Sequence, residues 1–264
     1  MNNAIGVFDS GVGGLTVARE IMRQLPNETI YYFGDVKNCP YGDKTKEEII
    51  KNTDRAIKFL IDKGVKLVVL ACNTATAAAL EYLQSKYEVP IIGVVQPGAR
   101  RAIQATENNK VLVLGTKFTA NSKVYDIEIE NINSDIIVFD KACPAFVPFI
   151  ESEGNLDKEA TKKLISDTLG KTNMLGVDTV VLGCTHYPIL KKDIEDYYGN
   201  NIKVISSGRE AAREVSTVLG YAKLHQKKLN KKEHRFFISE ESDNFNSIAS
   251  KWLKEDINAE VVEI

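Results

Sequence analysis

The chain has 264 residues, enough for one large α/β domain or for two domains of ordinary size. Hydrophobic residues make up 44% and charged residues 27%, a balance typical of a globular protein with a full core. The net charge of −2 excludes a strongly basic nucleic-acid or membrane-surface protein. The first residues lack the pattern of a secretory signal, and no run approaches the ~20 apolar residues of a membrane span.

Cysteine usage indicates the cellular compartment. The four cysteines, at positions 39, 72, 143 and 184, include no CxxC pair and no metal-type cluster. Widely spaced cysteines without a secretory signal favour free thiols over disulfides. We therefore expect a soluble, cytoplasmic protein.

Short apolar, β-branched runs alternate with helical patterns along the chain. The runs predict strands at Ala4–Phe8, Thr29–Phe33, Leu67–Ala71, Ile91–Val95, Lys110–Leu114, Asp135–Phe139, Thr179–Gly183 and Lys203–Ile205. Amphipathic stretches such as Lys46–Lys63 and Lys158–Leu175 predict helices between them. This alternation is typical of βαβ units, so we predict an α/β fold with mostly parallel sheets covered by helices on both faces.

The chain also contains an internal repeat. The segment 66–74 aligns with the segment 178–186, which brings Cys72 onto Cys184. The offset from position 72 to position 184 also relates the strands that start at Ile91 and Lys203. Strand patterns alone match easily in α/β proteins, so the informative feature is a cysteine at the end of each matched strand.

The repeat predicts two related domains. We expect the first domain to comprise residues 1–96 and 208–264, completed by a strand at His234–Ile238 and a helix at Asn244–Lys254. The second domain comprises residues 97–207. Ligands of open α/β sheets bind beyond the carboxyl ends of the strands, so two facing halves would bring both cysteines to one interdomain cleft.

Two facing thiols suit the inversion of a stereocentre. Racemisation needs a base on one face of the substrate and an acid on the other, and a thiol titrates near ~8.5, close enough to neutrality to serve as either. A buried cysteine is otherwise a small hydrophobic residue, and that interpretation is favoured for Cys39 and Cys143. For Cys72 and Cys184 the catalytic interpretation is favoured.

The segment Asp9–Gly14 directly follows the first predicted strand. Thr16 stands where the third glycine of a GxGxxG motif would be, so the segment is not a dinucleotide-binding loop. Its glycines permit a tight turn into a helix whose amides favour an anion, although they also fit plain strand-to-helix packing. Asp9 and Ser10 are the stronger candidates, because a carboxylate there can hold an ammonium group or assist a thiol.

Two further segments could carry chemistry. His186 is one of three histidines and lies in a Cys-Thr-His-Tyr-Pro context, which favours a catalytic over a structural role. Nothing near it completes a metal-ligand set. The turn Cys39–Gly42 is either structural or part of a loop that covers substrate through Tyr41. The basic run Lys227–Arg235 is typical of solvated surface.

Together these motifs resemble glutamate racemases. The matching segments are Val7–Val17, Cys39–Gly42, Ala71–Ala75, Gly115-Thr116 with Thr119, and Gly183–Pro188, in order from residue 7 to about residue 213. The resemblance implies two pseudo-symmetric three-layer domains with the active site in the cleft between them. It also implies a homodimer that interconverts L- and D-glutamate for bacterial peptidoglycan, without pyridoxal phosphate, nucleotide or metal.

The resemblance further implies a role for each site residue. Cys72 would take the α-proton from D-glutamate with help from Asp9, and Cys184 would take it from L-glutamate with help from His186. The implied substrate-binding residues are Asp9, Ser10, Tyr41, Gly42, Asn73, Thr74, Thr185 and His186, with Thr119 and Glu151 as secondary contributors. Ser206 stands where many relatives carry aspartate, which we expect to affect turn geometry and not the reaction.

Three other functions remain open on the sequence alone. Racemisation of aspartate or another amino acid is disfavoured by His186, because aspartate racemases usually carry glutamate at that position. A thiol hydrolase would use Cys184 as nucleophile and His186 as base, but it leaves Cys72 without a role, and residues two apart are poorly placed to interact. A non-catalytic amino-acid-binding protein would keep its ligand affinity when either cysteine becomes alanine.

Overall fold

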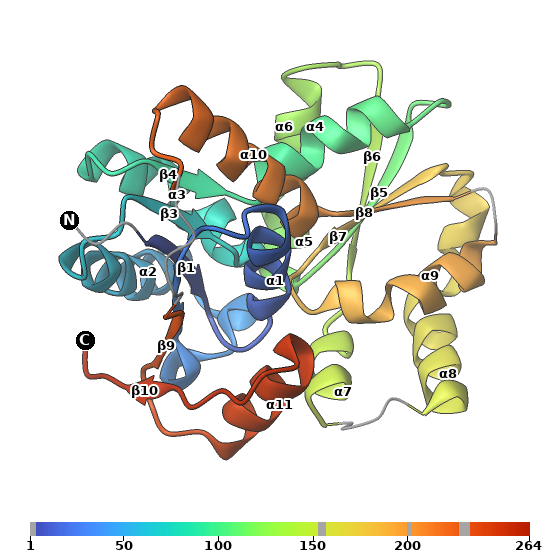
Figure 1. Cartoon of the computed structure of the whole chain (residues 1–264). Coiled ribbons are helices and arrows are strands. Elements are labelled where there is room, and N and C mark those ends of the chain that lie inside the picture. Colours follow the sequence, from blue (N-terminus) through green and yellow to red (C-terminus); the bar gives the residue numbers. More distant parts are fainter. Residues whose placement is uncertain (1–3, 153–156, 200–201, 227–232) are drawn as a thin grey trace. The chain divides into compact units, whose positions relative to one another are not determined.

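The computed structural model describes residues 4–152, 157–199, 202–226 and 233–264. The chain divides into two compact units (Figure 1). Unit 1 comprises Met1–Val94 and Gly208–Ile264, and unit 2 comprises Val95–Ser207. Each unit contains one parallel β-sheet with helices around it. None of the helices in the described ranges is long and apolar enough to cross a membrane.

The sheet of unit 1 has the strand order β10-β9-β2-β1-β3-β4. Its strands are β1 (Ile5–Asp9), β2 (Ile30–Gly34), β3 (Leu67–Leu70), β4 (Ile91–Gly93), β9 (Arg235–Ile238) and β10 (Glu260–Val261). All neighbouring strands are parallel, so their carboxyl ends lie at one edge. Only β10 has no counterpart among the predicted strands, because it is two exposed residues long.

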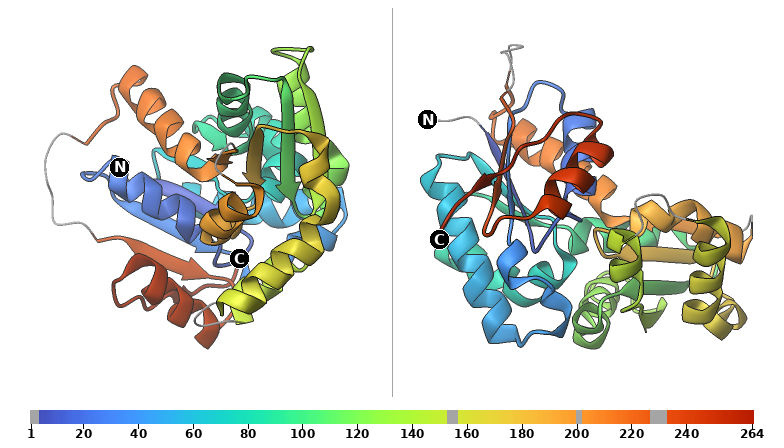
Figure 2. Two further views of the ribbon diagram at one scale, coloured as in Figure 1. Left: turned by 90° about the vertical axis from the view of Figure 1, so that its right-hand side faces the viewer. Right: turned by 90° about the horizontal axis from the view of Figure 1, so that it is seen from below.

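Helices cover both faces of this sheet, as the right-hand view of Figure 2 shows. The helices on one face are α1 (Leu15–Gln24), α10 (Ser207–Tyr221) and α11 (Asp243–Leu253), which share an apolar core with inward residues such as Val7 and Val69. The opposite face carries α2 (Lys46–Asp62), where Phe59 contacts Phe33 of β2, and α3 (Asn73–Lys86). Two 3-10 turns, η1 (Val36–Asn38) and η2 (Tyr41–Asp43), connect β2 to α2.

The sheet of unit 2 has the order β6-β5-β7-β8 and is also parallel throughout. Its strands are β5 (Lys110–Gly115), β6 (Ile137–Ala142), β7 (Thr179–Gly183) and β8 (Lys203–Ser206). The helices α4 (Val95–Ala105) and α6 (Val124–Glu130) pack on the face formed by Val111, Val113 and Val181. The remaining helices are α5 (Lys117–Ser122), α7 (Phe146–Ser152), α8 (Lys158–Leu169), η3 (Gly170–Leu175), η4 (Tyr187–Leu190) and α9 (Lys191–Tyr198).

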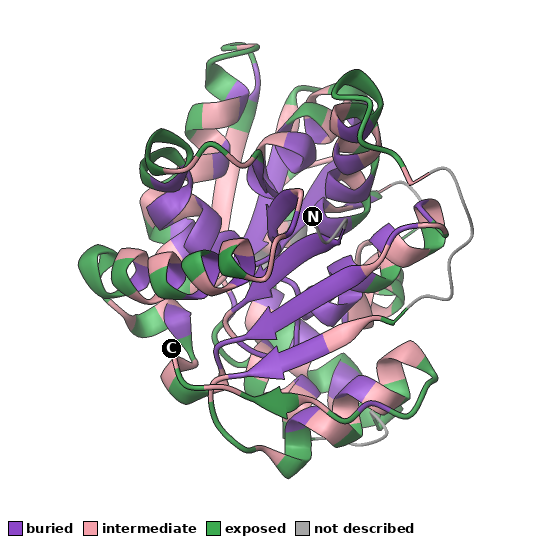
Figure 3. Cartoon of the chain, turned by 60° about the vertical axis from the view of Figure 1, so that its left-hand side comes forward, coloured by how far each residue is buried: buried purple, intermediate pink, exposed green. Residues whose placement is uncertain are grey.

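The internal repeat reappears in the topology. The order β2-β1-β3-β4 in unit 1 matches the order β6-β5-β7-β8 in unit 2, so β3 and β7 are equivalent strands. Most strand residues are buried, which is why they read as continuous apolar runs, whereas β10 at the sheet edge is exposed (Figure 3). The predicted α/β class with parallel sheets is confirmed.

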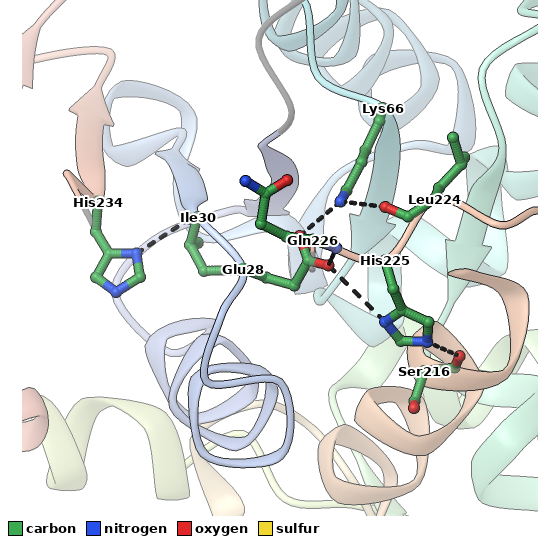
Figure 4. Close-up of polar contacts among 8 residues, drawn as sticks. All are labelled: Glu28, Ile30, Lys66, Ser216, Leu224, His225, Gln226 and His234. Atoms are coloured by element: carbon green, nitrogen blue, oxygen red, sulfur yellow. Dashed lines mark hydrogen bonds and ion pairs between the residues drawn. The ribbon is translucent and has the colours of Figure 1, made fainter. Parts of the chain in front are cut away.

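A buried ion pair lies at the amino ends of two strands in unit 1 (Figure 4). Glu28 and Lys66 precede β2 and β3, and Lys66 Nζ lies 2.6 Å from Glu28 Oε2. Lys66 Nζ also donates to the Leu224 carbonyl at 2.6 Å, and the Gln226 amide donates to Glu28 Oε1 at 2.9 Å. The pair therefore fastens the segment after α10 to the edge of the sheet opposite the carboxyl ends of the strands.

Candidate active site

Cys72 occupies the step from β3 into α3. It is the N-cap of α3: its Sγ accepts the Ala75 amide at 3.4 Å, and the side chain is hydrogen-bonded to Ser10 Oγ at 3.7 Å. Amide groups at a helix N-terminus stabilise negative charge, so this position favours a thiolate. Asn73 and Thr74 follow as the first residues of α3 and are both buried.

Asp9 lies at the carboxyl end of β1, the strand next to β3. It is fully buried, and its Oδ2 accepts the Gly11 amide at 3.1 Å. A Cβ on Gly14 would lie 2.4 Å from Asp9 Cβ, so the turn into α1 requires glycine at that position. Tyr32 Oη donates to the Gly11 carbonyl at 2.7 Å and ties the turn to β2. The assistance of Asp9 to Cys72 stays a prediction.

Tyr41 and Gly42 lie in η2, beyond the carboxyl end of β2. Tyr41 Oη donates to Asp35 Oδ2 at 2.6 Å. Burial and the charge of Asp35 raise the pKa of Tyr41, so its hydroxyl stays protonated. Asp35 also accepts from Asn38 Nδ2 at 3.0 Å and from Ser239 Oγ at 2.8 Å. This organising carboxylate was not predicted as part of the site, although it lies two residues after a predicted strand.

Cys184 follows β7 in unit 2, and a short turn brings it to His186. The Cys184 Sγ to His186 Nδ1 distance is 3.9 Å, and His186 Nε2 lies 2.7 Å from Glu151 Oε1 of α7. The expectation that residues two apart are poorly placed to interact is therefore wrong, because the turn directs both side chains the same way. Cys184, His186 and Glu151 therefore form a continuous thiol–imidazole–carboxylate network within unit 2.

The protonation of His186 follows from these contacts. Burial alone would lower the pKa of His186, but the hydrogen bonds to Cys184 and Glu151 outweigh it and raise the pKa to about 10. His186 is then an imidazolium at neutral pH, with one N–H toward the carboxylate and the other toward the sulfur. The imidazolium places a positive charge beside the Cys184 sulfur, and the amino terminus of α3 places its amide groups beside the Cys72 sulfur.

Replacing Glu151 by glutamine should shift the pH dependence of turnover. A raised pKa keeps His186 charged until the pH passes about 10. Removing the carboxylate lowers that pKa, so the alkaline fall of kcat/KM should move to lower pH while the plateau near neutrality changes less. Rate profiles from pH 6 to 11 test this, and an unshifted alkaline limb in Glu151→Gln would show that His186 is not the titrating group.

The remaining predicted residues lie at the carboxyl end of the unit 2 sheet. Thr119 of α5 is fully buried, and its hydroxyl lies 3.1 Å from Thr116 Oγ1. Thr185 is buried between Cys184 and His186. Cys143, just after β6, is also buried, and burial raises its pKa to about 12. That thiol stays protonated, in keeping with a structural residue.

Each unit by itself thus gathers its predicted residues at the carboxyl edge of its sheet. The set in unit 1 comprises Asp9, Ser10, Tyr41, Gly42, Cys72, Asn73 and Thr74. The set in unit 2 comprises Thr119, Glu151, Cys184, Thr185 and His186. Within the part of the chain that the structure describes, no three His, Cys, Asp or Glu side chains form a group that could hold a metal ion.

Comparisons with known proteins agree with this organisation. The family model for Asp/Glu/hydantoin racemases matches residues 5–215. A glutamate racemase of Staphylococcus haemolyticus is 48% identical over 264 residues, covering 100% of this chain and 99% of its own. The crystal structure of a glutamate racemase from Bacillus anthracis has a TM-score of 0.95 at 40% identity, over 99% of this chain and 98% of the other. A glutamate racemase from Francisella tularensis, solved in complex with D-glutamate, has a TM-score of 0.92 at 34% identity, with the same coverage.

The fold and these similarities define a racemase, which is an isomerase that inverts a stereocentre. The chain belongs to the Asp/Glu/hydantoin racemase family.

Proposed function

We propose that this chain interconverts L- and D-glutamate by proton transfer between Cys72 and Cys184, without pyridoxal phosphate, nucleotide or metal. The observation that carries the proposal is the equivalent placement of the two thiols, one after β3 and one after β7 of the repeated sheet. The relatives named above, which are glutamate racemases, support glutamate as the substrate. The site would lie in a cleft between a first domain of residues 1–96 and 208–264 and a second of 97–207.

The two thiols account for both proton transfers of the reaction. With L-glutamate bound, the Cys184 thiolate takes the α-proton, and the Cys72 thiol gives its proton to the opposite face of the carbon. The enzyme is left with a Cys184 thiol and a Cys72 thiolate, which is the form that accepts D-glutamate. The His186 imidazolium stabilises the first thiolate, and the amino terminus of α3 stabilises the second.

The carbanion intermediate needs further stabilisation, because an amino-acid α-proton is a very weak acid. Hydroxyl groups of Ser10 and Thr185 and amides of the turns after β3 and β7 are donors that could face the substrate carboxylate. Closure of the two domains around the substrate would exclude competing water. Asp9 would hold the ammonium group or assist Cys72.

In the cell, the product D-glutamate would supply peptidoglycan synthesis. We propose a cytoplasmic homodimer for this role, with glutamate as the small-molecule substrate and with no nucleic-acid or membrane partner. The small net charge of −2 supports the absence of a nucleic-acid partner.

A thiol hydrolase is the second candidate, because Cys184, His186 and Glu151 form a nucleophile–base–acid line. Such an enzyme would use only unit 2 and leave Cys72 idle. It would also release a product without changing the optical activity of recovered glutamate. The equivalent cysteine in unit 1 therefore favours the racemase.

Circular dichroism separates the two candidates. Purified protein without added cofactor should bring the signal of either pure enantiomer of glutamate to zero, and should act much more slowly on aspartate. In D₂O, deuterium should enter the α-position of the product enantiomer, because the proton it receives comes from a thiol that exchanges with solvent. Activity that requires added pyridoxal phosphate, or product without deuterium, would refute the two-thiol mechanism.

A further inference from the structure

Tyr187 is a fully buried residue that follows Cys184 by three positions. Its single O–H is shared between two carbonyls, Gly115 O at 3.1 Å and Cys143 O at 2.9 Å. Gly115 ends β5 and Cys143 directly follows β6. A single phenol from the turn after β7 therefore holds the carboxyl ends of the two neighbouring strands.

This contact fixes one end of the turn that carries the thiol. The Tyr187 amide donates to the Cys184 carbonyl at 3.2 Å, which closes the turn Cys184–Tyr187. At the other end, Gly183 pairs with Gly115 in the sheet, and a Cβ on Gly183 would lie 2.9 Å from the Leu114 carbonyl. Cys184, Thr185 and His186 thus lie between two anchored points.

The two carbonyls at the strand ends do not depend on the Tyr187 hydroxyl, because each also accepts a hydrogen bond from a backbone amide. The Gly115 carbonyl also accepts the Cys143 amide at 2.9 Å, and the Cys143 carbonyl also accepts the Phe146 amide at 3.2 Å. The ring of Tyr187 packs edge-on against Phe146, with centroids 5.1 Å apart. Burial and the nearby charge of Cys184 raise the pKa of Tyr187, so the phenol donates throughout the working pH range.

We propose that Tyr187 is a positioning residue, whose hydroxyl holds Cys184 and His186 in the geometry needed to take the α-proton from the L-enantiomer. The proposal rests on the proposed racemase function. Tyr187 does not touch the reacting atoms; it acts through the turn it closes. A displacement of the thiol by a fraction of an ångström is enough to slow proton transfer, because the reacting atoms must be held at near-contact distance.

Tyr187→Phe tests the proposal, since it removes one hydroxyl and keeps the ring. We expect kcat/KM to fall about ten- to a hundredfold, by the same factor in both directions because L- and D-glutamate have equal free energies. The step at Cys184 should become more rate-limiting. The primary isotope effect on kcat/KM should therefore rise for α-deuterated L-glutamate and fall for α-deuterated D-glutamate.

Tyr198→Phe is the matched control, because Tyr198 of α9 also loses a hydroxyl contact in unit 2, to Thr172 at 2.7 Å. Both variants should lower the melting temperature by only about 2–4 °C. Isotope effects in Tyr187→Phe that match wild type, or that change equally for both enantiomers, would overturn the proposal. Wild-type protein measured in parallel tests the racemase function itself, so a failure of that function is distinguishable from a failure of this inference.

Discussion

Changing either Cys72 or Cys184 to alanine is expected to lower racemisation by about 10²- to 10⁴-fold, because each variant loses the acid or the base on one face of the substrate. The loss should be equally complete in both directions, since one missing proton transfer blocks the whole inversion. Neither variant should lose its fold, as both side chains are small and sit at strand ends. Optical rotation with each enantiomer measures the loss, and thermal unfolding checks the fold.

The two variants should nevertheless differ in hydrogen exchange. Cys72→Ala retains Cys184, so in D₂O it should exchange the α-proton of L-glutamate only. Cys184→Ala should exchange only that of D-glutamate. Proton NMR of each enantiomer gives the answer directly. Exchange of both enantiomers by one variant would contradict a facing pair, and undiminished turnover in Cys72→Ala would support a hydrolase that uses only Cys184.

Lys66→Met is expected to destabilise unit 1 by up to about 3–5 kcal/mol, because it removes the lysine ammonium group from the buried Glu28 carboxylate. The side chains of Glu28 and Lys66 are 2% and 7% exposed, and Glu28 keeps the Gln226 amide at 2.9 Å and His225 Nδ1 at 3.9 Å as neighbours. The variant also leaves the Leu224 carbonyl without the lysine contact. The pair lies at the amino ends of the strands, so the kcat of the folded fraction should stay near wild type.

Urea denaturation with a matched variant separates this effect from a general loss of charge. Lys58→Met removes the exposed pair of Lys58 with Asp62, whose side chains are 59% and 58% exposed. That change should cost only about 0.3–0.5 kcal/mol. The double variant Glu28→Gln/Lys66→Met should recover part of the loss, since no charge is then stranded. Equal urea midpoints for Lys66→Met and Lys58→Met would show that the buried ion pair stabilises the protein no more than the exposed one.

Patterns of apolar residues were sufficient to predict nearly all strands of the two sheets. The eight strands from β1 to β8 and the returning β9 lie within a few residues of the runs that predicted them. Most of them are buried parallel strands, which are continuously apolar, whereas β6 is half-buried. The predicted helix Lys158–Leu175 was too long: α8 ends at Leu169, where Gly170 turns the chain with a φ of 53°. The strand β10 was not predicted, because it is only two residues long and exposed.

Only part of the candidate site could be predicted from the sequence. A repeat that aligns one cysteine of each half predicted Cys72 and Cys184 as a pair, and the structure places them after the equivalent strands β3 and β7. The hydrogen bonds made by buried polar groups could not be predicted from the sequence. Asp35 accepts from Tyr41, six residues further on, and from Ser239, which is distant in the chain, and the phenol of Tyr187 contacts Cys143, 44 residues away; no local pattern predicts such hydrogen bonds.

The pairing of β9 with β2 has a consequence for synthesis of the chain on the ribosome. Unit 2 is one continuous stretch, so all its strands are available once Ser207 has been made. The sheet of unit 1 cannot be completed at that stage. The edge of β2 that pairs with β9 stays open until Arg235–Ile238 has been synthesised, after the whole of unit 2. An open strand edge is a template for pairing with other chains. Chains that stop before Arg235 should therefore aggregate, even though both cysteines and every other residue of the proposed site would be present.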